Sequence, residues 1–534
     1  MSVSSVVFPT RNLVAAGSAS AKEAARFLIQ STFGPTPQTL QQLLDSGYEA
    51  WLAEQFSLPR ASHADYVRAA PAPANPDDVT VDPFMESFWL QALTGRDQLR
   101  QRIAFALSEI LVISCASGPL ENEPLALATY LDLLGQHAFG NFWKLLVGVT
   151  LHPAMGAYLN MLQNDKEDPT SGQNPNENYA RELLQLFTIG LYRLNADGTV
   201  QLDAARKPIP TYDQDTIKGF AKVMTGWGWG NNPDKESDNS FIDPDRTGTW
   251  DYPMESWPNH HSASSKKLLN GVVLAPGQSA EQDLKDGLDN IFHHPNVGPF
   301  IAKRLIQRLV TSNPSPAYVS RVAAAFADDG GGVRGNLKQV VRAILLDPEA
   351  RDVGLAATPR FGKLKEPVLR FSGLLRAFAA RSPSGKYGIY NLEDAAYGLN
   401  QNPFRAPSVF NFFSPFFSQP GILRAAGLAS PEFQITHATS IVGVANVLHD
   451  TIMQGYGDES DPITLDFSAY TPLAADPASL VDQIALLLCA DSPTPAARAT
   501  MAQAVSSVPA DDALTRAQTA AYLIVISPQC AVQQ

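Results

Sequence analysis

Apolar residues recur at helical spacing along most of the chain. In the segment that begins near Lys22, Ala25, Leu28 and Ile29 follow one another at i, i+3 and i+4, and Gly34 and Pro35 then end the pattern. Comparable helical segments are expected at residues 36–44, 48–56, 83–93, 97–113, 124–137, 139–151, 282–292, 298–311, 318–328, 337–346 and 359–380, and two or three more helices within 476–490 and 495–526. Because strand-like alternation is scarce, the sequence predicts an all-α protein, a large and mainly helical globule.

A few segments depart from the helical pattern. Residues 191–202 hold two short alternating stretches around Asp197-Gly198, which predicts a β-hairpin. The region 227–274 has little periodicity but carries four tryptophans, so we expect an ordered loop that packs over the helix containing Glu182. Residues 390–423 form a second, aromatic loop, and the proline-rich stretch 62–83 is expected to be a loop as well.

The sequence suggests three parts. Residues 1–20 are interpreted as a flexible tail, because no apolar stretch follows Arg11 as it would in a signal peptide, with a degenerate export signal as the alternative. Residues 21–450 would form the main helical domain. Residues 451–534 would form a C-terminal helical segment packed on it.

Composition excludes several classes of protein. Of 534 residues, 40 are Lys or Arg and 53 are Asp or Glu, so the net charge of −13 argues against a surface for nucleic acid or anionic membranes. No apolar run is long enough for a transmembrane segment. Three cysteines without a CxxC motif provide no disulfide framework, and Cys115 is interpreted as a core thiol.

The most suggestive polar pattern lies in residues 174–190, which predict one helix that Asn174 caps and Gly190 ends. Asn178, Glu182 and Gln185 share one face of this helix, and Arg181 flanks them. Glu182 could act as a general base in a catalytic site. Alternatively, these side chains form a buried polar network in which Glu182 pairs with Arg102 or Arg181.

His261, in the long loop, and His294, before Pro295, are the candidate histidines. One hypothesis joins both with Glu182 in a single cleft, as acid and base or as metal ligands. The other is that each histidine anchors a loop by hydrogen bonds, and the adjacent His260 and His293 are alternatives.

Three further patterns are weaker. Trp227, Trp229, Trp250 and Trp257 could stack on sugar rings or could pack the loop. The phenylalanines of the second loop are interpreted as core residues: Phe404, Phe410, Phe412, Phe413, Phe416 and Phe417. Residues 243–248 partly match a calcium-binding loop, although a tight turn is the favoured interpretation.

Three blocks together resemble a bacterial family called domain of unknown function 1800. They are AARFLIQSTFGP at 24–35, NPNENYARELLQLFTIG at 174–190 and APSVFNFFSP at 406–415, and the resemblance extends over nearly the whole chain. The stretch NYARE at 178–182 is its most specific element.

The resemblance implies a mostly helical, often exported protein, frequently encoded beside a protein of alkaline-phosphatase-like or sulfatase-like fold. The family name supplies no reaction. Many members carry a histidine-rich block where this chain has residues 105–110, and a histidine where it has Phe187. A metal site built from those histidines would therefore lack ligands here, and both the metal content and the cofactors stay open.

Two hypotheses of function follow. The first is an exported or envelope-associated accessory protein that works with an alkaline-phosphatase-like or sulfatase-like partner. The second is a hydrolase or lyase, with carbohydrate as the expected substrate, whose cleft contains Glu182, Arg181 and His261. An enzyme should bring Glu182 and a histidine to one pocket, whereas an accessory protein should bury Glu182 and expose an apolar patch.

Overall fold

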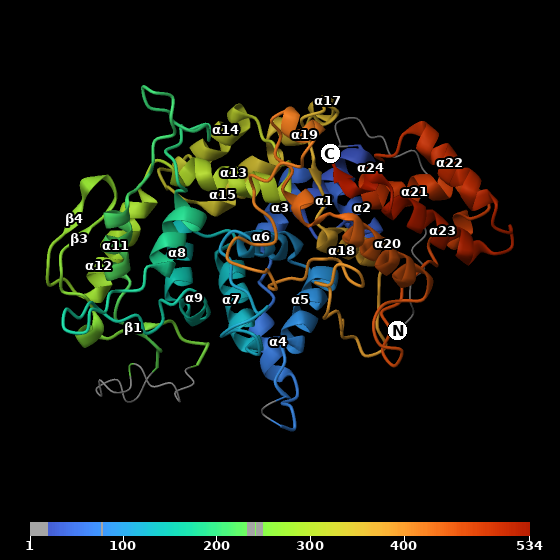
Figure 1. Cartoon of the computed structure of the whole chain (residues 1–534). Coiled ribbons are helices and arrows are strands. Elements are labelled where there is room, and N and C mark those ends of the chain that lie inside the picture. The colour runs from blue at the N-terminus through green and yellow to red at the C-terminus, as the bar shows by residue number, and fades with distance from the viewer. Residues whose placement is uncertain (1–19, 76–77, 232–240, 242–248) are drawn as a thin grey trace.

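The computed structural model describes residues 20–75, 78–231, 241 and 249–534 (Figure 1). The N-terminal half of the described chain contains α1 (Ala21–Ser31), α2 (Pro37–Ser46), α3 (Tyr48–Ser57), α4 (His63–Ala69), α5 (Asp82–Thr94), α6 (Gln98–Ser108), α7 (Pro124–His137), α8 (Phe142–Leu151), α9 (Pro153–Tyr158), α10 (Asn178–Glu182) and α11 (Gln214–Val223). The helices that follow are α12 (Ala280–Phe292), α13 (Val297–Leu309), α14 (Pro316–Ala327), α15 (Leu337–Leu346), α16 (Pro348–Arg351), α17 (Val353–Ala356), α18 (Pro367–Ala377), α19 (Ile422–Ala425), α20 (Ala438–Met453), α21 (Pro477–Cys489), α22 (Pro495–Ser506), α23 (Ala513–Val525) and α24 (Pro528–Ala531). The predicted all-α fold class is confirmed.

Sequence signals explain where many helices begin. The first helix starts with a capping box, in which the Ser20 hydroxyl accepts from the Glu23 N–H and the Glu23 carboxylate accepts from the Ser20 N–H. Several later helices carry a proline in the first turn, where its missing N–H costs nothing, and α7, α14 and α21 are examples.

Strands are few and short in the described residues. They form three antiparallel pairs, β1 (Trp227–Gly228) with β2 (Glu255–Ser256), β3 (Lys266–Lys267) with β4 (Val273–Leu274), and β5 (Lys363–Leu364) with β6 (Val532–Gln533). The last pair ties the C-terminus to the segment before α18. The Arg26 Nε, in α1, donates to the carbonyl of Gln534 at 2.6 Å, so both ends of the described chain meet.

The predicted hairpin is confirmed. Its bridge joins Leu194 to Val200, and the Asn195 N–H donates to the Thr199 carbonyl at 2.8 Å. Gly198 closes the turn with φ +75°, the left-handed conformation that glycine adopts without strain. A third stretch, 207–211, pairs with both strands of the hairpin, because the Arg193 N–H donates to Ile209 and the Ile209 N–H donates to Gln201. The hairpin extends beyond the helices at the top left of Figure 1.

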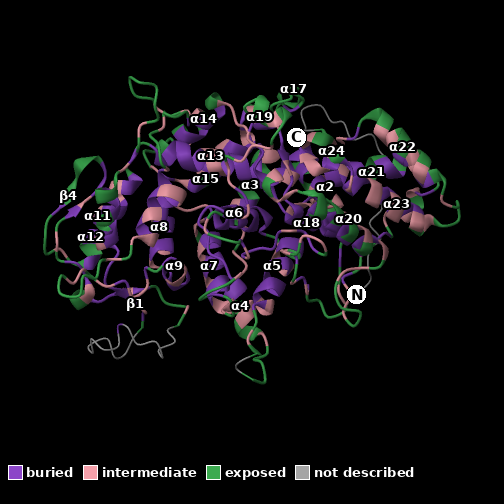
Figure 2. Ribbon diagram, in the orientation of Figure 1, coloured by how far each residue is buried: buried purple, intermediate pink, exposed green. Residues whose placement is uncertain are grey.

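One continuous apolar core runs through the molecule. In Figure 1, α11, α12 and the β3–β4 pair lie at one end, α6, α7 and α13 lie in the middle, and α20 to α24 lie at the other end. Figure 2 shows that the helices of the middle are mainly buried, whereas the hairpin is mainly exposed. Helix α1 packs against α21, so the first and last parts of the chain share this core. The proposed division into a main domain and a C-terminal segment stays a prediction.

The structure corrects three of the expectations for individual elements. The stretch 62–83, expected to be a loop, contains α4, which the Ser62 hydroxyl caps. Helix α20 was not predicted at all. The single helix expected at 174–190 begins only at Asn178, and after Glu182 it continues as a π-helix, Leu183–Thr188. Gly190 does adopt the expected left-handed conformation, with φ +72°.

The long loop is described only in part, because residues 232–240 and 242–248 lie outside the described residues, as does the calcium-like segment 243–248. Its described part carries β1 to β4 and packs against α11 through β3, and against α12, where His261 and Leu269 hydrogen-bond Asp283 and Asn290. The strands of the described loop do not pack over α10, the helix that contains Glu182, so that expectation was wrong. The tail at residues 1–19 also lies outside the description.

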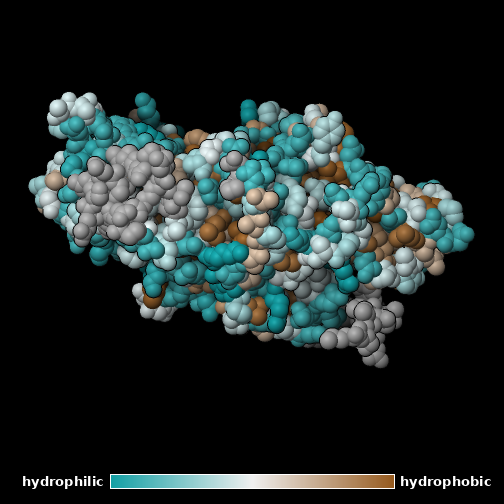
Figure 3. Space-filling model, turned by 90° about the horizontal axis from the view of Figure 1, so that it is seen from below, coloured by the Kyte–Doolittle hydropathy of each residue, from teal (hydrophilic) through white to brown (hydrophobic). Residues whose placement is uncertain are grey.

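Among the described helices, none is long and apolar enough to span a membrane. The face shown in Figure 3 is largely hydrophilic, with separate hydrophobic patches.

Candidate functional site

The polar residues of α10 divide between the surface and the interior. Asn178 is half-buried, and its side-chain amide donates to the Asn160 side chain at 3.1 Å. Arg181 forms an ion pair with Glu177 at 2.8 Å, near the surface. Glu182 points inward and is buried. The three residues do share one short helix, as predicted, but only Glu182 belongs to the interior.

Glu182 is an isolated buried carboxyl. Its Oε2 atom has no hydrogen-bond partner among the described residues. Burial raises the pKa of Glu182 from its ordinary value, and the charge of Arg181 opposes that shift only in part. The charge of Glu182 also acts on the Tyr212 phenol, whose pKa it helps to raise. Arg102, the other expected partner, instead donates to the carbonyl of Arg308 at 2.7 Å.

His261 belongs to a buried network that anchors the long loop. Its Nε2 lies 2.8 Å from Asp283 Oδ2, and its Nδ1 lies 2.9 Å from the carbonyl of Thr225. The Lys266 ammonium pairs with the same Asp283 carboxylate at 2.6 Å, and both of these side chains are fully buried. Because both ring nitrogens are occupied, His261 has the environment of a structural histidine.

His294 also has a structural environment. Its Nδ1 accepts from the Asn296 N–H at 3.1 Å. Burial, with the nearby charges of Arg193 and Arg334, lowers the pKa of His294 to about 4, so the ring is neutral near pH 7. In the described part of the chain, no hydrogen bond or ion pair links Glu182 to His261 or His294. The shared cleft therefore has no contact to support it.

A pocket of about 470 Å³ lies elsewhere, between four segments of the chain. We call it the aromatic groove. Its walls come from the π-helix with Ile189 and Gly190, the hairpin, α13 and the loop 409–416, and its inner end is formed by residues that follow α6. Its lining is mostly apolar, and its size falls within the range of ligand-binding pockets in proteins.

Aromatic side chains stand at the rim of the aromatic groove. Phe410 is 56% exposed and Phe416 is 69% exposed, whereas Phe404 and Phe413 are buried. Interpreting all the phenylalanines of this loop as core residues was therefore wrong for Phe410 and Phe416. A sequence cannot distinguish the two kinds, because both occur in one aromatic run without helical or strand period.

Cationic side chains line the same groove. Arg304, on α13, stacks between two rings, with its guanidinium carbon 4.9 Å from the Phe300 centroid and 4.4 Å from the Phe416 centroid. Burial, together with the charge of Arg308, lowers the pKa of Arg304 to about 9. Burial also lowers the pKa of Lys303, beside it. Within the described residues, neither Lys303 nor Arg304 has a carboxylate within ion-pair distance.

The inner end of the groove opens on a buried cluster of charges. Arg308 Nη1 lies 3.3 Å from Glu109 Oε1 and 3.9 Å from Glu366 Oε1. Lys363 Nζ lies 3.6 Å from Glu366 and 3.1 Å from Glu432. Burial raises the pKa of Glu109 to about 8, and its carboxyl hydrogen-bonds Glu366. Glu109 is therefore a neutral acid near pH 7 at the wall of the pocket.

The remaining candidates have packing roles. Trp227 and Trp257 are buried, while the half-buried Trp229 and Trp250 form an edge-to-face pair with centroids 4.9 Å apart. Cys115 is buried, as expected of a core thiol, and burial raises its pKa to about 11. No cluster of three or more metal-binding side chains occurs among the residues that the structure describes.

Fold and site together define a large helical protein with an aromatic, cation-lined groove. The chain belongs to the family described as "Protein of unknown function (DUF1800)", whose model matches residues 26–532. The resemblance carried by the blocks at 24–35, 174–190 and 406–415 is thus confirmed. No curated protein and no solved structure matches the chain.

Proposed function

We propose that this protein is an accessory protein that acts by binding, and that the aromatic groove is its docking site for a partner protein. The family resemblance suggests that the partner has an alkaline-phosphatase-like or sulfatase-like fold and that the pair works outside the cytoplasm or at the envelope.

The observation that carries the proposal is the apolar rim of the pocket. Phe410, Phe416, Leu191, Tyr192 and Val200 all border the pocket, and each is exposed. Exposed apolar side chains gathered round a cavity are typical of interaction sites, because water contact with them is costly. The accessory hypothesis also expects Glu182 to be buried, as it is.

The charges of the aromatic groove indicate which chemical groups of the partner would bind there. Lys303 and Arg304 lie in an apolar setting and form no ion pair among the described residues, although the charge of Asp197 acts on Lys303 and the protein as a whole carries a net charge of −13. A carboxylate beside them would recover the electrostatic energy that burial costs. The occupant is therefore proposed to be an extended segment of the partner in which aromatic or aliphatic side chains stand next to Asp, Glu or the chain terminus.

Binding to the purified alkaline-phosphatase-like or sulfatase-like protein of the same genome tests this proposal. The double substitution Phe410→Ala with Phe416→Ala should weaken the complex at least about tenfold, or about 1.4 kcal/mol, because buried aromatic anchors dominate interface energies. Arg304→Gln should weaken it as well and should reduce its dependence on salt. Since Phe410 and Phe416 are mainly exposed, their loss should lower the urea midpoint only slightly, by the contact between Phe416 and Arg304, which is worth about 0.5–1 kcal/mol at an exposed site.

Tyr397 provides a matched control, because it is an aromatic residue, 88% exposed, that does not line the groove. Tyr397→Ala should bind the partner as the wild type does. The proposal is rejected if calorimetry detects no complex with the wild type, or if the double variant and Tyr397→Ala bind with equal affinity.

A hydrolase or lyase is the second candidate, favoured by one observation. The raised pKa of Glu182 is the property of a general acid or base, and carbohydrate stays the expected substrate. If this candidate is correct, a screen of glycoside and ester substrates should reveal an activity that Glu182→Gln abolishes and Glu177→Gln retains. An activity that survives Glu182→Gln would remove Glu182, with Arg181 and His261, from catalysis. Metal analysis of the purified protein would complete this test.

A further inference from the structure

Two of the three cysteines lie side by side near the C-terminus. Cys489 ends α21 and Cys530 lies in α24, and both are buried. The Cys530 thiol donates to the carbonyl of Leu488, the residue directly before Cys489, at 3.4 Å. The Cys489 thiol donates to the carbonyl of Ala485 in its own helix at 3.2 Å. The two thiols lie close enough for each to shift the pKa of the other. The fold thus brings together two thiols that are 41 positions apart in the sequence.

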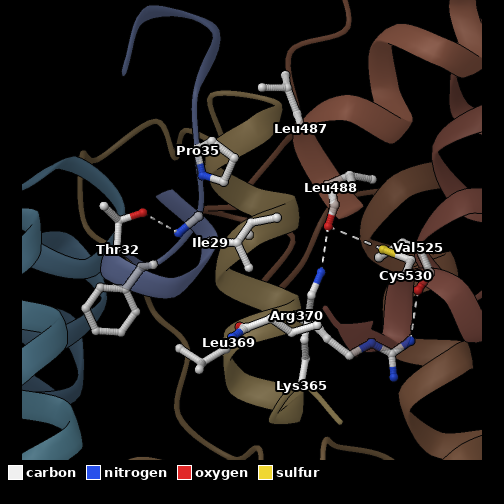
Figure 4. A pocket seen from close by; sticks show the side chains of 14 residues that line it. Ile29, Thr32, Pro35, Lys365, Leu369, Arg370, Leu487, Leu488, Val525 and Cys530 are labelled. Atoms are coloured by element: carbon white, nitrogen blue, oxygen red, sulfur yellow. Dashed lines mark hydrogen bonds between the residues drawn. The ribbon is translucent and has the colours of Figure 1, made fainter. Parts of the chain in front are cut away.

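Two cations lie close to this pair of thiols. The Lys365 ammonium donates to the same Leu488 carbonyl at 2.7 Å, so it approaches Cys530 from the side of α18 (Figure 4). The Arg370 guanidinium donates to the Val525 carbonyl at 2.9 Å, and its Nε has no hydrogen-bond partner among the described residues. The neighbouring Cys489 thiol and the charges of Lys365 and Arg370 lower the pKa of Cys530, against the opposing effect of burial.

Cys530 also lines a small pocket of about 30 Å³, together with Lys365, Arg370 and Gln533 (Figure 4). This volume is close to that of one water molecule. An oxidant that acts on Cys530 must therefore be very small, and hydrogen peroxide is a reagent of that kind, whereas a disulfide of the size of oxidised glutathione is excluded. The ammonium of Lys365 and the guanidinium of Arg370, which border the pocket, would stabilise the hydroxide that leaves when the O–O bond of the peroxide breaks.

We propose that Cys489 and Cys530 are a peroxide-sensitive dithiol that closes to a disulfide. The Cys530 thiolate attacks one oxygen of hydrogen peroxide, the O–O bond breaks, and the departing hydroxide takes up a proton to become water. Cys530 is then a sulfenic acid. The Cys489 thiol attacks that sulfur, the S–S bond forms, and the hydroxyl leaves as a second water. The two thiols supply two electrons, and one peroxide becomes two waters.

The product would join the end of α21 to α24 covalently. Because α24 is followed at once by β6, which pairs with β5 before α18, the bond would fix the C-terminal edge of the molecule. This site is separate from the aromatic groove and does not depend on the proposed function. Cys115 is an internal control, since it is buried against the Phe404 carbonyl and burial raises its pKa to about 11.

The experiment treats the reduced, native full-length protein with hydrogen peroxide, quenches it in denaturant with an alkylating agent, and maps the peptides by mass spectrometry. We expect one disulfide between the peptides containing Cys489 and Cys530, and Cys115 fully alkylated. The loss of free Cys530 should be at least about tenfold faster than that of Cys115, because the thiolate is the nucleophile. Oxidised glutathione should have no effect on the native protein.

Two variants separate the steps. Cys489→Ser should leave Cys530 as a sulfenic acid that dimedone traps, and Cys530→Ser should leave Cys489 unreacted. The proposal is overturned if all three thiols of the wild type remain alkylatable, or if Cys115 is lost as fast as Cys530. A disulfide that forms only in denaturant would overturn it as well, and the wild-type experiment decides the matter even if a variant fails to fold.

Discussion

Asn296 shows how one buried side chain positions a wall of the aromatic groove. It is 1% exposed, its Oδ1 accepts from the Leu194 N–H at 2.9 Å, and its Nδ2 donates to the carbonyls of Ile189 and Tyr192 at 2.8 Å each. The residue precedes α13, so these three bonds attach the base of the hairpin to the helix that carries Lys303 and Arg304. No apolar period or motif marks such a residue in a sequence.

Replacing Asn296 by Ala should destabilise the protein. The change leaves one N–H and two carbonyls without their partner, and buried unsatisfied groups cost about 1–3 kcal/mol each, so we expect a loss of about 3 kcal/mol in unfolding free energy. Urea unfolding measures this loss, and amide hydrogen exchange at Leu194 should become faster. Asn195→Ala, in the exposed turn of the same hairpin, should cost less than about 1 kcal/mol. Equal losses in the two variants would contradict the role assigned to Asn296.

At the scale of elements, the helix carrying Glu182 illustrates why a boundary can be missed. Asn174 and Pro175 have the pattern of a helix start, yet the chain delays the helix to Asn178. The Asn164 side chain accepts from the Asn176 N–H at 2.8 Å, and the Asn176 side chain accepts from the Asn178 N–H at 2.9 Å. These bonds compete with helix formation and prevail.

Elements with a strong local signal were predictable from the sequence. The apolar period located α2, α7 and α15 closely, and the Asp197-Gly198 pair located the hairpin, because these signals act over a few residues. The groove was not predictable. Exposure of Phe410 and burial of Phe413 depend on how α13 and the hairpin approach the loop, which is a tertiary property. The pairing of His261 with Asp283 has the same origin.

The hairpin provides a prediction at this scale. A Cβ added to Gly198 would lie 2.9 Å from Val319 Cγ1, and the residue has φ +75°. Gly198→Ala should therefore cost about 1–2 kcal/mol for the left-handed conformation and more for the contact with α14. Gly172→Ala is the matched control, because Gly172 has φ +77° and open space around its Cα. Urea unfolding should show a larger loss for Gly198→Ala, and equal losses would mean that the hairpin does not press on α14.

At the scale of the whole molecule, the buried charge cluster joins segments from across the chain. Arg102 and Glu109 come from α6 and its end, Arg308 from α13, and Glu366 precedes α18, all of which meet in the middle of Figure 1. Burial would raise the pKa of Glu366, but the charges of Lys363 and Arg308 outweigh it and lower that pKa to about 2. The two carboxyls thus have opposite roles, with Glu366 ionised and Glu109 protonated near pH 7.

Two isosteric substitutions test this assignment. Glu366→Gln removes the anion that balances Lys363 and Arg308, and breaking a buried ion pair typically costs about 3–5 kcal/mol, so urea unfolding at pH 7 should show a loss of that size. Glu109→Gln replaces a carboxyl that is already neutral and that has to take up a proton on folding at pH 7, so it should not destabilise the protein at that pH. Equal losses in the two variants would show that the proton does not reside on Glu109.

The pH dependence gives an independent measurement of the same assignment. The pKa of Glu109 is raised to about 8 by burial, from an ordinary value of 4.5, so between these pH values the folded state holds a proton that the unfolded chain has lost. The unfolding free energy of the wild type should therefore fall as the pH rises through that window, because the folded state has to take up this proton from an increasingly basic solution. Glu109→Gln cannot titrate, so subtracting its stability curve from that of the wild type should leave a difference that falls by up to about 1.4 kcal/mol per pH unit. A difference that stays flat from pH 5 to pH 8 would contradict a protonated Glu109. A difference that rises would mean that the proton shared by Glu109 and Glu366 does not reside on Glu109.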